Sequence, residues 1–144
     1  MTDQWLPEET TTHQDHVIAH VVGASVLGYL VHEEALHVLL DIGFIWTIYL
    51  DGQMVLLPQS VAISELQTES ETRAEINREV ERLEREGSSA TALRHLTAAP
   101  DECLITEVSF FANADRRRLI LKGENASLVI ETSLTTAQIA VSTT

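Results

Sequence analysis

Histidine and carboxylate side chains that could bind a metal ion are concentrated near the start of the chain. Four of the six histidines lie between residues 16 and 40, inside an otherwise apolar run. Imidazole nitrogens and carboxylate oxygens are common ligands of zinc and other transition metals. The residues that could form such a site are His13, Asp15, His16 and His20.

The distance between His16 and His20 depends on the secondary structure that carries them. On a helix they would lie about 6 Å apart, which suits zinc. On a strand they would lie about 13 Å apart, too far for one ion. Residues 17–22 are rich in β-branched side chains, which favour a strand. We therefore predict no metal site, and metal binding through these residues remains an alternative.

Other residues with catalytic potential also fit a purely structural reading. Glu33 and Glu34 follow His32 between two strand-like runs, where adjacent glutamates are typical of a solvated turn. Asp41 lies in an apolar stretch and suggests an acid, but it equally suits a turn before the next strand. The segment around Ser25 lacks the second glycine of a G-x-S-x-G nucleophile elbow. No catalytic residue and no cofactor is predicted.

Composition and charge exclude several classes of partner. The chain has 144 residues, 44% of them hydrophobic and 22% charged, values typical of a folded domain. Its net charge of −13 repels nucleic acid and anionic membrane surfaces. The apolar runs at 17–31 and 35–50 are too short or too polar to cross a membrane. Cys103 is the only cysteine, and the first dozen residues do not resemble a signal peptide, so a cytoplasmic location is expected.

Two β-hairpins are predicted in the first half of the chain. Residues 44–50 and 53–57 flank Asp51-Gly52, a strong turn signal, and a two-residue turn would place Trp46 opposite Leu57. A second turn at Gly23-Ala24 would join strands at 17–22 and 25–31. Residues 60–67 fit either a last strand or an early helical turn.

The second half begins with helical patterns and returns to strands. Ile76, Val80 and Leu83 form an apolar stripe at helical spacing in a charged segment, which predicts a helix at about 69–86. A short helix is predicted at about 89–97, because Ser88-Ser89 can cap it and Pro100 ends it. Strand-like runs follow at 103–112, 119–122 and 126–132, and the tail at 134–141 fits a short helix or an edge strand.

The predicted fold class is α+β. An antiparallel sheet is built from two sequence blocks, about 16–66 and 103–132, with the two helices packed on one face. The whole chain, 1–144, is expected to be one domain in which residues 1–14 form a loosely ordered leader.

The predicted function is that of a non-enzymatic, cytoplasmic interaction domain: an assembly, chaperone-like or regulatory factor, acting as a homodimer. Large apolar side chains and a cluster of arginines could supply the interface. These residues are Trp46, Tyr49, Met54, Phe111, Arg116, Arg117 and Arg118.

Two alternatives stay open. One is a metal-binding protein or metal-dependent enzyme that uses the four residues named above, with Glu33 or Asp41 as acid or base. The other is a binder of a small apolar ligand, held between helix and sheet by Tyr29, Trp46 and Phe110.

Overall fold

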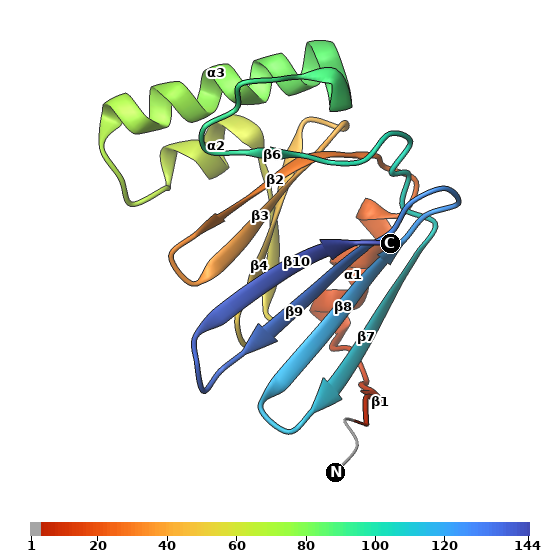
Figure 1. Cartoon of the computed structure of the whole chain (residues 1–144). Coiled ribbons are helices and arrows are strands. Elements are labelled where there is room, and N and C mark those ends of the chain that lie inside the picture. The colour runs from red at the N-terminus through yellow and green to blue at the C-terminus, as the bar shows by residue number, and fades with distance from the viewer. Residues whose placement is uncertain (1–3) are drawn as a thin grey trace.

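The computed structural model describes residues 4–144 and confirms the α+β class. Within these residues, the strands form two antiparallel five-stranded sheets, accompanied by helices (Figure 1). The elements in chain order are β1 (Leu6–Pro7), α1 (Thr12–Val21), β2 (Val26–His32), β3 (Ala35–Leu40), β4 (Phe44–Tyr49), β5 (Met54–Pro58), α2 (Gln59–Ser64), α3 (Ser70–Glu86), the 3₁₀-helix η1 (Gly87–Ser89), β6 (Thr97–Ala98), β7 (Glu107–Asn113), β8 (Arg116–Lys122), β9 (Leu128–Ser133) and β10 (Gln138–Thr143).

The two sequence blocks form two separate sheets. The first sheet has the strand order β5-β4-β3-β2-β6, and the second has the order β1-β7-β8-β9-β10. Helices α2 and α3 cover one face of the first sheet, and the second sheet packs on the other (Figure 1). The layers are therefore helices, first sheet and second sheet, so the two predicted strand blocks are stacked rather than joined edge to edge.

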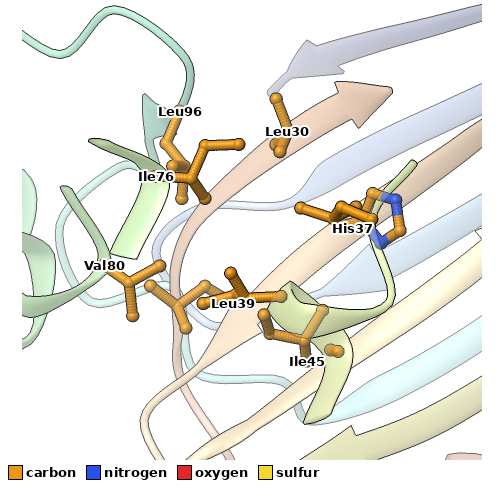
Figure 2. Close-up of a pocket in the computed structure, with 10 residues that line it drawn as sticks. Leu30, His37, Leu39, Ile45, Ile76, Val80 and Leu96 are labelled. Carbon is orange, nitrogen blue, oxygen red and sulfur yellow. The ribbon is translucent and has the colours of Figure 1, made fainter. Parts of the chain in front are cut away.

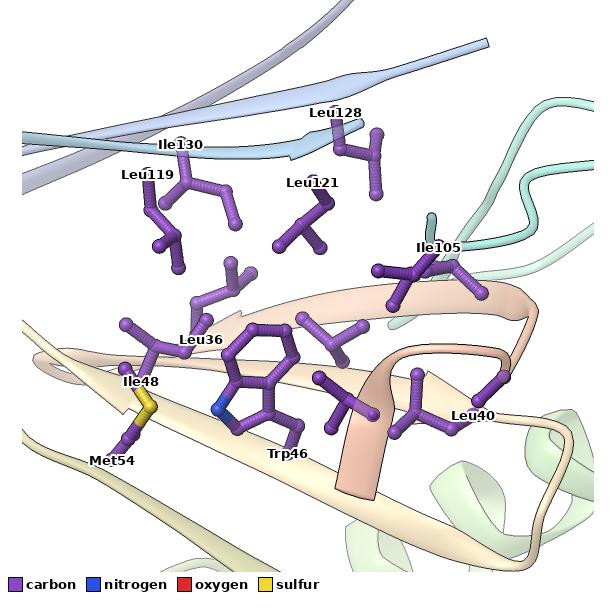
Figure 3. Packing of buried hydrophobic residues seen from close by; sticks show 14 of the residues in the cluster. Leu36, Leu40, Trp46, Ile48, Met54, Ile105, Leu119, Leu121, Leu128 and Ile130 are labelled. Carbon is purple, nitrogen blue, oxygen red and sulfur yellow. The ribbon is translucent and has the colours of Figure 1, made fainter. Parts of the chain in front are cut away.

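Strand β3 is buried on both faces because it lies in the middle layer. Leu36, Val38 and Leu40 point into the core between the sheets, together with Trp46 of β4 (Figure 3). Leu39 points the other way, into the core beneath the helices. A strand that is covered on both faces reads as a continuous apolar run, as residues 35–40 do.

The predicted strand at 17–22 is wrong, because residues 12–21 form helix α1. A capping box starts this helix: the Thr11 hydroxyl accepts a bond from the Gln14 N–H, and the Gln14 side chain accepts one from the Thr11 N–H. Val17 and Val21, four residues apart, are both buried in the core between the sheets. Burial of this stripe outweighs the β-propensity of the segment.

The turn at Gly23-Ala24 is also wrong as a hairpin, because β2 pairs with β3 instead. Glu33 and Glu34 make that turn, and Glu33 has a φ of 55°. Residues 23–26 bond to residues 103–105, with Ser25 and Leu104 as an isolated bridge. The start of β2 is therefore bonded to the segment that leads into β7 of the second sheet.

The hairpin at Asp51-Gly52 is confirmed, although its register differs by one residue from the predicted one. Trp46 pairs with Leu56, and the Tyr49 N–H donates to the Gln53 carbonyl. The loop thus has three residues and ends at Gly52, whose φ of +90° suits glycine. A Cβ on Gly52 would also lie 2.9 Å from the Phe110 ring, so the turn packs directly against the second sheet.

The charged helix is confirmed as α3, and its predicted stripe of Ile76, Val80 and Leu83 is buried. The short helix predicted at 89–97 does not form there. Only the 3₁₀-helix η1 follows α3, and the chain then runs without regular structure to β6. The short helix of the fold is instead α2, which begins one residue before the ambiguous segment 60–67 and ends within it.

The three later strands are found as β7, β8 and β9, and the tail takes the edge-strand alternative as β10. Strand β8 begins at Arg116, three residues before the strand-like run at 119–122, so the three arginines lie in a strand. Of the predicted leader, residues 1–3 lie outside the described part. Leu6 and Pro7 pair with β7, and Thr11 caps α1.

Candidate interaction surface

The residues predicted to form an interface lie in three different environments. Trp46, with none of its surface exposed, and Met54 lie in the core between the sheets, so they contact no partner while the fold is intact. Tyr49 is 43% exposed at the end of β4. Phe111 is half-buried in β7. The structure therefore does not gather the predicted apolar residues into one patch.

The arginines of β8 bind carboxylates of the same chain. Side chains alternate along the strand, so Arg116 and Arg118 lie on the face opposite the buried Leu119. Arg118 donates two hydrogen bonds to the Glu131 carboxylate, at 2.9 and 2.6 Å, and Arg116 donates one at 3.5 Å. Arg117 pairs with Glu8 at 3.2 Å. Each of the three guanidinium groups is thus engaged with a carboxylate of the same chain.

Trp5 completes this cluster on the outer face of the second sheet. Its ring lies 4.2 Å from the Arg118 guanidinium carbon and 4.9 Å from that of Arg116. Cation–π contacts of this kind contribute about 0.5–1 kcal/mol each at exposed sites. The cluster therefore holds the N-terminal segment against the sheet.

Strand β10 is the edge of the second sheet that no described strand covers. It pairs with β9 on one side only. Ser127 and Thr144 exchange both backbone bonds, which fixes the phase of this antiparallel ladder. Because hydrogen-bonded and non-bonded pairs alternate, Ile139, Val141 and Thr143 direct their N–H and C=O groups away from β9. We call this row of backbone groups the β10 edge.

The β10 edge also lacks the features by which proteins protect exposed strands. Such edges usually carry charged residues or proline, or are very short or covered. No charged residue and no proline occurs from Thr132 to Thr144, although 22% of the chain is charged. The six residues of β10 therefore form an open, neutral pairing edge.

The other edge strands within residues 4–144 are short, end in proline or are covered. Strand β6 has two residues, and so does β1, which ends at Pro7. Strand β5 ends at Pro58 and lies against α1, where the His13 ring nitrogen Nε2 is 2.8 Å from the Met54 carbonyl oxygen. The Gln14 amide donates to the Gly52 carbonyl at the same end. This contrast makes the β10 edge the strongest candidate for an interaction site.

The candidate metal ligands all lie on α1, with Asp15 in its first turn and His20 in its last. His16 and His20 are exposed and four residues apart, so the helix brings them within about 6 Å instead of the 13 Å of a strand. His13 is engaged with Met54, and Asp15 accepts a bond from Thr10. In the described part of the chain, no three His, Cys, Asp or Glu side chains form a group that could hold a metal ion.

Residues near the β2–β3 turn line an open hollow of about 340 Å³ that includes His32, His37 and Tyr49. The His37 nitrogen Nδ1 lies 2.9 Å from the Thr47 hydroxyl. Burial, and to a lesser extent the nearby His32, lowers the pKa of His37 to about 4. His37 is therefore a neutral imidazole near pH 7.

Asp41, Cys103 and the Glu33-Glu34 pair have structural roles. The Asp41 carboxylate accepts a hydrogen bond from the Ser25 N–H and so fixes the corner before β2. Cys103 is buried, and burial raises the pKa of its thiol, which keeps it protonated and unreactive. Glu33 and Glu34 form the β2–β3 turn.

The space between the helices and the first sheet is nearly filled. Leu30, His37, Leu39 and Ile76 are among the side chains that line a cavity of about 20 Å³ (Figure 2). A cavity of this volume has room for about one water molecule. Trp46 and Phe110, proposed to hold an apolar ligand there, belong to the other core, between the sheets.

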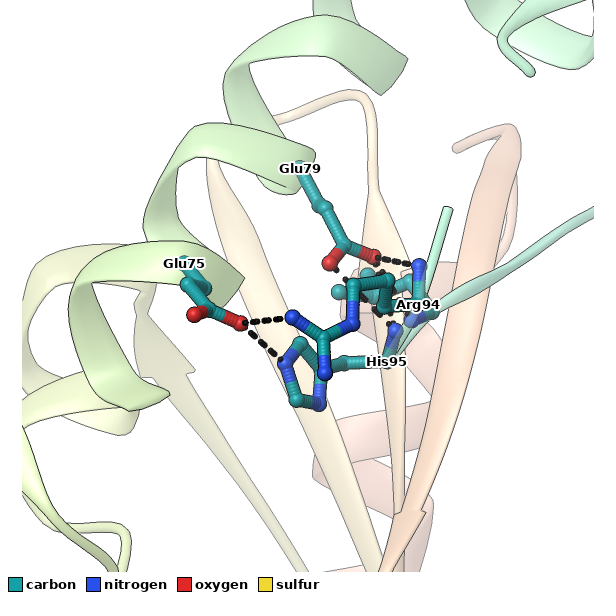
Figure 4. Close-up of polar contacts among 5 residues, drawn as sticks. Glu75, Glu79, Arg94 and His95 are labelled. Atoms are coloured by element: carbon teal, nitrogen blue, oxygen red, sulfur yellow. Dashed lines mark hydrogen bonds and ion pairs between the residues drawn. The ribbon is translucent and has the colours of Figure 1, made fainter. Parts of the chain in front are cut away.

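A polar cluster between α3 and residues 94–96 was not predicted. The Glu79 carboxylate, only 6% exposed, accepts the backbone N–H bonds of Arg94, His95 and Leu96 at 3.0–3.1 Å (Figure 4). Glu75 binds the His95 ring at 2.9 Å, and this hydrogen bond is the main reason that the pKa of Glu75 is lowered. The position of Glu79 could have indicated this cluster, because a glutamate three residues after Ile76 lies on the apolar face of the helix.

Comparison with protein-family models, with curated proteins and with solved structures gives no match. None of the helices in residues 4–144 is both long and apolar enough to cross a membrane. The function must therefore be inferred from the geometry of the chain alone.

Proposed function

We propose that this chain is a non-enzymatic, cytoplasmic interaction domain that works as a homodimer, in an assembly, chaperone-like or regulatory role. The observation that carries the proposal is the β10 edge, an open and uncharged strand in a protein whose other sheet edges are short, end in proline or are covered. An open strand edge binds another strand through backbone hydrogen bonds, a common mode of protein recognition.

A second copy of the chain is the partner best suited to this edge. Two molecules that each carry a net charge of −13 repel one another, so contact is least costly where charge is absent. The stretch from Thr132 to Thr144 has no charged side chain. The nearest acidic group on the neighbouring strand, Glu131, is paired with Arg116 and Arg118.

Sedimentation equilibrium over the micromolar range tests the proposal. We expect a reversible dimer, and we expect its dissociation constant to fall as the salt concentration rises, because salt screens the repulsion between acidic surfaces. A species with the mass of one chain at every concentration, at low and high salt, would refute self-association.

A further inference from the structure

We infer that two copies pair β10 with β10 in antiparallel orientation about a two-fold axis at Val141, so that the two second sheets become one ten-stranded sheet. In this register Ile139 lies opposite Thr143 of the other copy. The inference rests on the proposed homodimer and specifies the surface and the register that it uses.

The ladder between β9 and β10 restricts the register. Backbone N–H and C=O groups already bond to β9 at Gln138, Ala140 and Ser142. These residues lie at two-residue intervals from Thr144, whose N–H and C=O both bond to Ser127. A two-fold axis midway between two residues would set outward-directed groups opposite groups that are already bonded to β9. The axis must therefore pass through a residue position, and an axis at Ala140 or Ser142 would allow only two hydrogen-bonded pairs within β10.

Among the outward-directed residues, Val141 is the central one. An axis at Val141 pairs it with itself and pairs Ile139 with Thr143 in both directions. Each of these three pairs exchanges two backbone bonds, so every outward N–H and C=O of β10 finds a partner. An axis at Ile139 or at Thr143 would leave part of the edge unpaired.

The side chains agree with this register. Ile139 and Val141 lie on the same face as Ile130 and Thr132 of β9 and pack, partly buried, against the core between the sheets. The second copy would extend this apolar face with a Val141–Val141 pair, and β-branched pairs of this kind stabilise antiparallel ladders. Ala140 and Ser142 on the opposite face add no charge.

Electrostatic repulsion across the proposed seam is small. The two copies of Glu131, on the two β9 strands, would lie three strand spacings or at least about 14 Å apart. This exceeds the Debye length of about 8 Å at physiological salt. In addition, Arg118 donates two bonds to Glu131 within each copy.

Cysteine cross-linking tests the register directly. Val141→Cys places two thiols across the axis at a Cα separation of about 5.5 Å, within disulfide range. The native Cys103 is buried and should not react. Under mild oxidation we expect Val141→Cys to form a covalent dimer. Ser142→Cys is the matched control, because its two copies lie two residues out of register, beyond disulfide reach.

A mixing experiment tests the same register independently. Ile139→Cys and Thr143→Cys should each stay uncross-linked alone, because each residue is four positions out of register with its own copy. Mixed in equal amounts, they should form the heterodimer. Cross-linking of Ser142→Cys instead of Val141→Cys, or equal cross-linking of all variants, would overturn the register.

A proline variant tests the edge without relying on oxidation. The Val141 N–H makes no bond to β9, so Val141→Pro should leave the fold intact and remove two bonds at the axis. We expect the dissociation constant of the dimer to rise at least roughly tenfold, while the variant still unfolds cooperatively. Lys placed at Val141 should give the same loss, since it sets two positive charges face to face.

The outcomes separate this inference from the proposed function. A dimer that survives Val141→Pro and Val141→Lys and resists the cross-link would overturn the β10 pairing while leaving self-association in place. A native chain that is monomeric would overturn both. A dimer that is lost in Val141→Pro and trapped in Val141→Cys supports both.

Discussion

Replacing Glu79 with alanine should destabilise the protein by about 3–5 kcal/mol. The carboxylate accepts the N–H groups of Arg94, His95 and Leu96 at 3.0–3.1 Å, and it is 6% exposed. Hydrogen bonds to a charged group contribute about 1.5–3 kcal/mol each. Because the three bonds share one acceptor and the freed segment can turn toward water, the expected loss is less than their sum.

Urea unfolding followed by tryptophan fluorescence, to which Trp5 and the buried Trp46 both contribute, measures this loss. Glu81→Ala is the matched control: Glu81 is exposed on the same helix and should change the stability by no more than about 0.5 kcal/mol. Glu79→Gln keeps an acceptor oxygen without the charge and should fall between the two. All variants must be compared at one protein concentration, since a dimer's stability depends on it.

Hydrogen exchange locates the effect. In Glu79→Ala, the amides of residues 94–96 should exchange faster than those of β3, because the lost bonds release this segment before the core opens. If Glu79→Ala matched Glu81→Ala in stability and the amides of 94–96 kept their protection, the carboxylate would not be what holds the segment, and the reasoning would fail.

Three further predictions concern pH, packing and metal. The pKa of His37 is lowered to about 4, so between about pH 4 and 6.5 the unfolded chain binds a proton that the folded chain does not. The free energy of unfolding should therefore have its full value above about pH 6.5 and fall by up to about 3 kcal/mol toward pH 4. His37→Gln should flatten this trend in urea titrations at different pH values. Gly28→Ala should cost about 1–3 kcal/mol in the same assay, because a Cβ would lie 2.7 Å from the Thr97 carbonyl oxygen; an unchanged midpoint would contradict this close approach. Equimolar zinc should leave the melting temperature of the untagged protein unchanged, because His16 and His20 have no third ligand in the described part of the chain. A rise in melting temperature with zinc that His20→Ala abolishes would favour the metal-binding alternative.

Local signals predicted those elements whose own residues determine them. Asp51-Gly52 marked the β4–β5 hairpin because its turn is built from local backbone preferences. The stripe at Ile76, Val80 and Leu83 marked α3 because the helix buries one face only. The one-residue shift of the hairpin register follows from its three-residue loop, whose Gly52 packs against Phe110 in the second sheet.

Helix α1 was missed because two local signals conflicted. Thr11 and Gln14 have the spacing of a capping box, which indicates a helix start. The β-branched residues that follow favour a strand in isolation, and only the core between the sheets, which buries Val17 and Val21, decides for the helix. This error also displaced the partner of β2, since the strand assigned to 17–22 took the place of β3.

The candidate site was harder to predict than the fold class. Apolar side chains such as Trp46 and Met54 looked suitable for an interface, but the second sheet covers them. The tail was recognised as a possible edge strand, yet its importance depends on the protection of the other edges. For β5 that protection comes from α1, which reaches the strand through His13, and no local pattern reveals such a contact.

The stacking of the two sheets has a consequence for synthesis of the protein on the ribosome. The face of the first sheet that carries Leu36, Val38 and Trp46 is covered by Leu119, Leu121 and Ile130, which are made more than seventy residues later. Helices α2 and α3 can cover the opposite face well before that point. A nascent chain that has reached α3 therefore exposes one broad apolar face, and it depends on the arrival of β8 and β9 to escape aggregation.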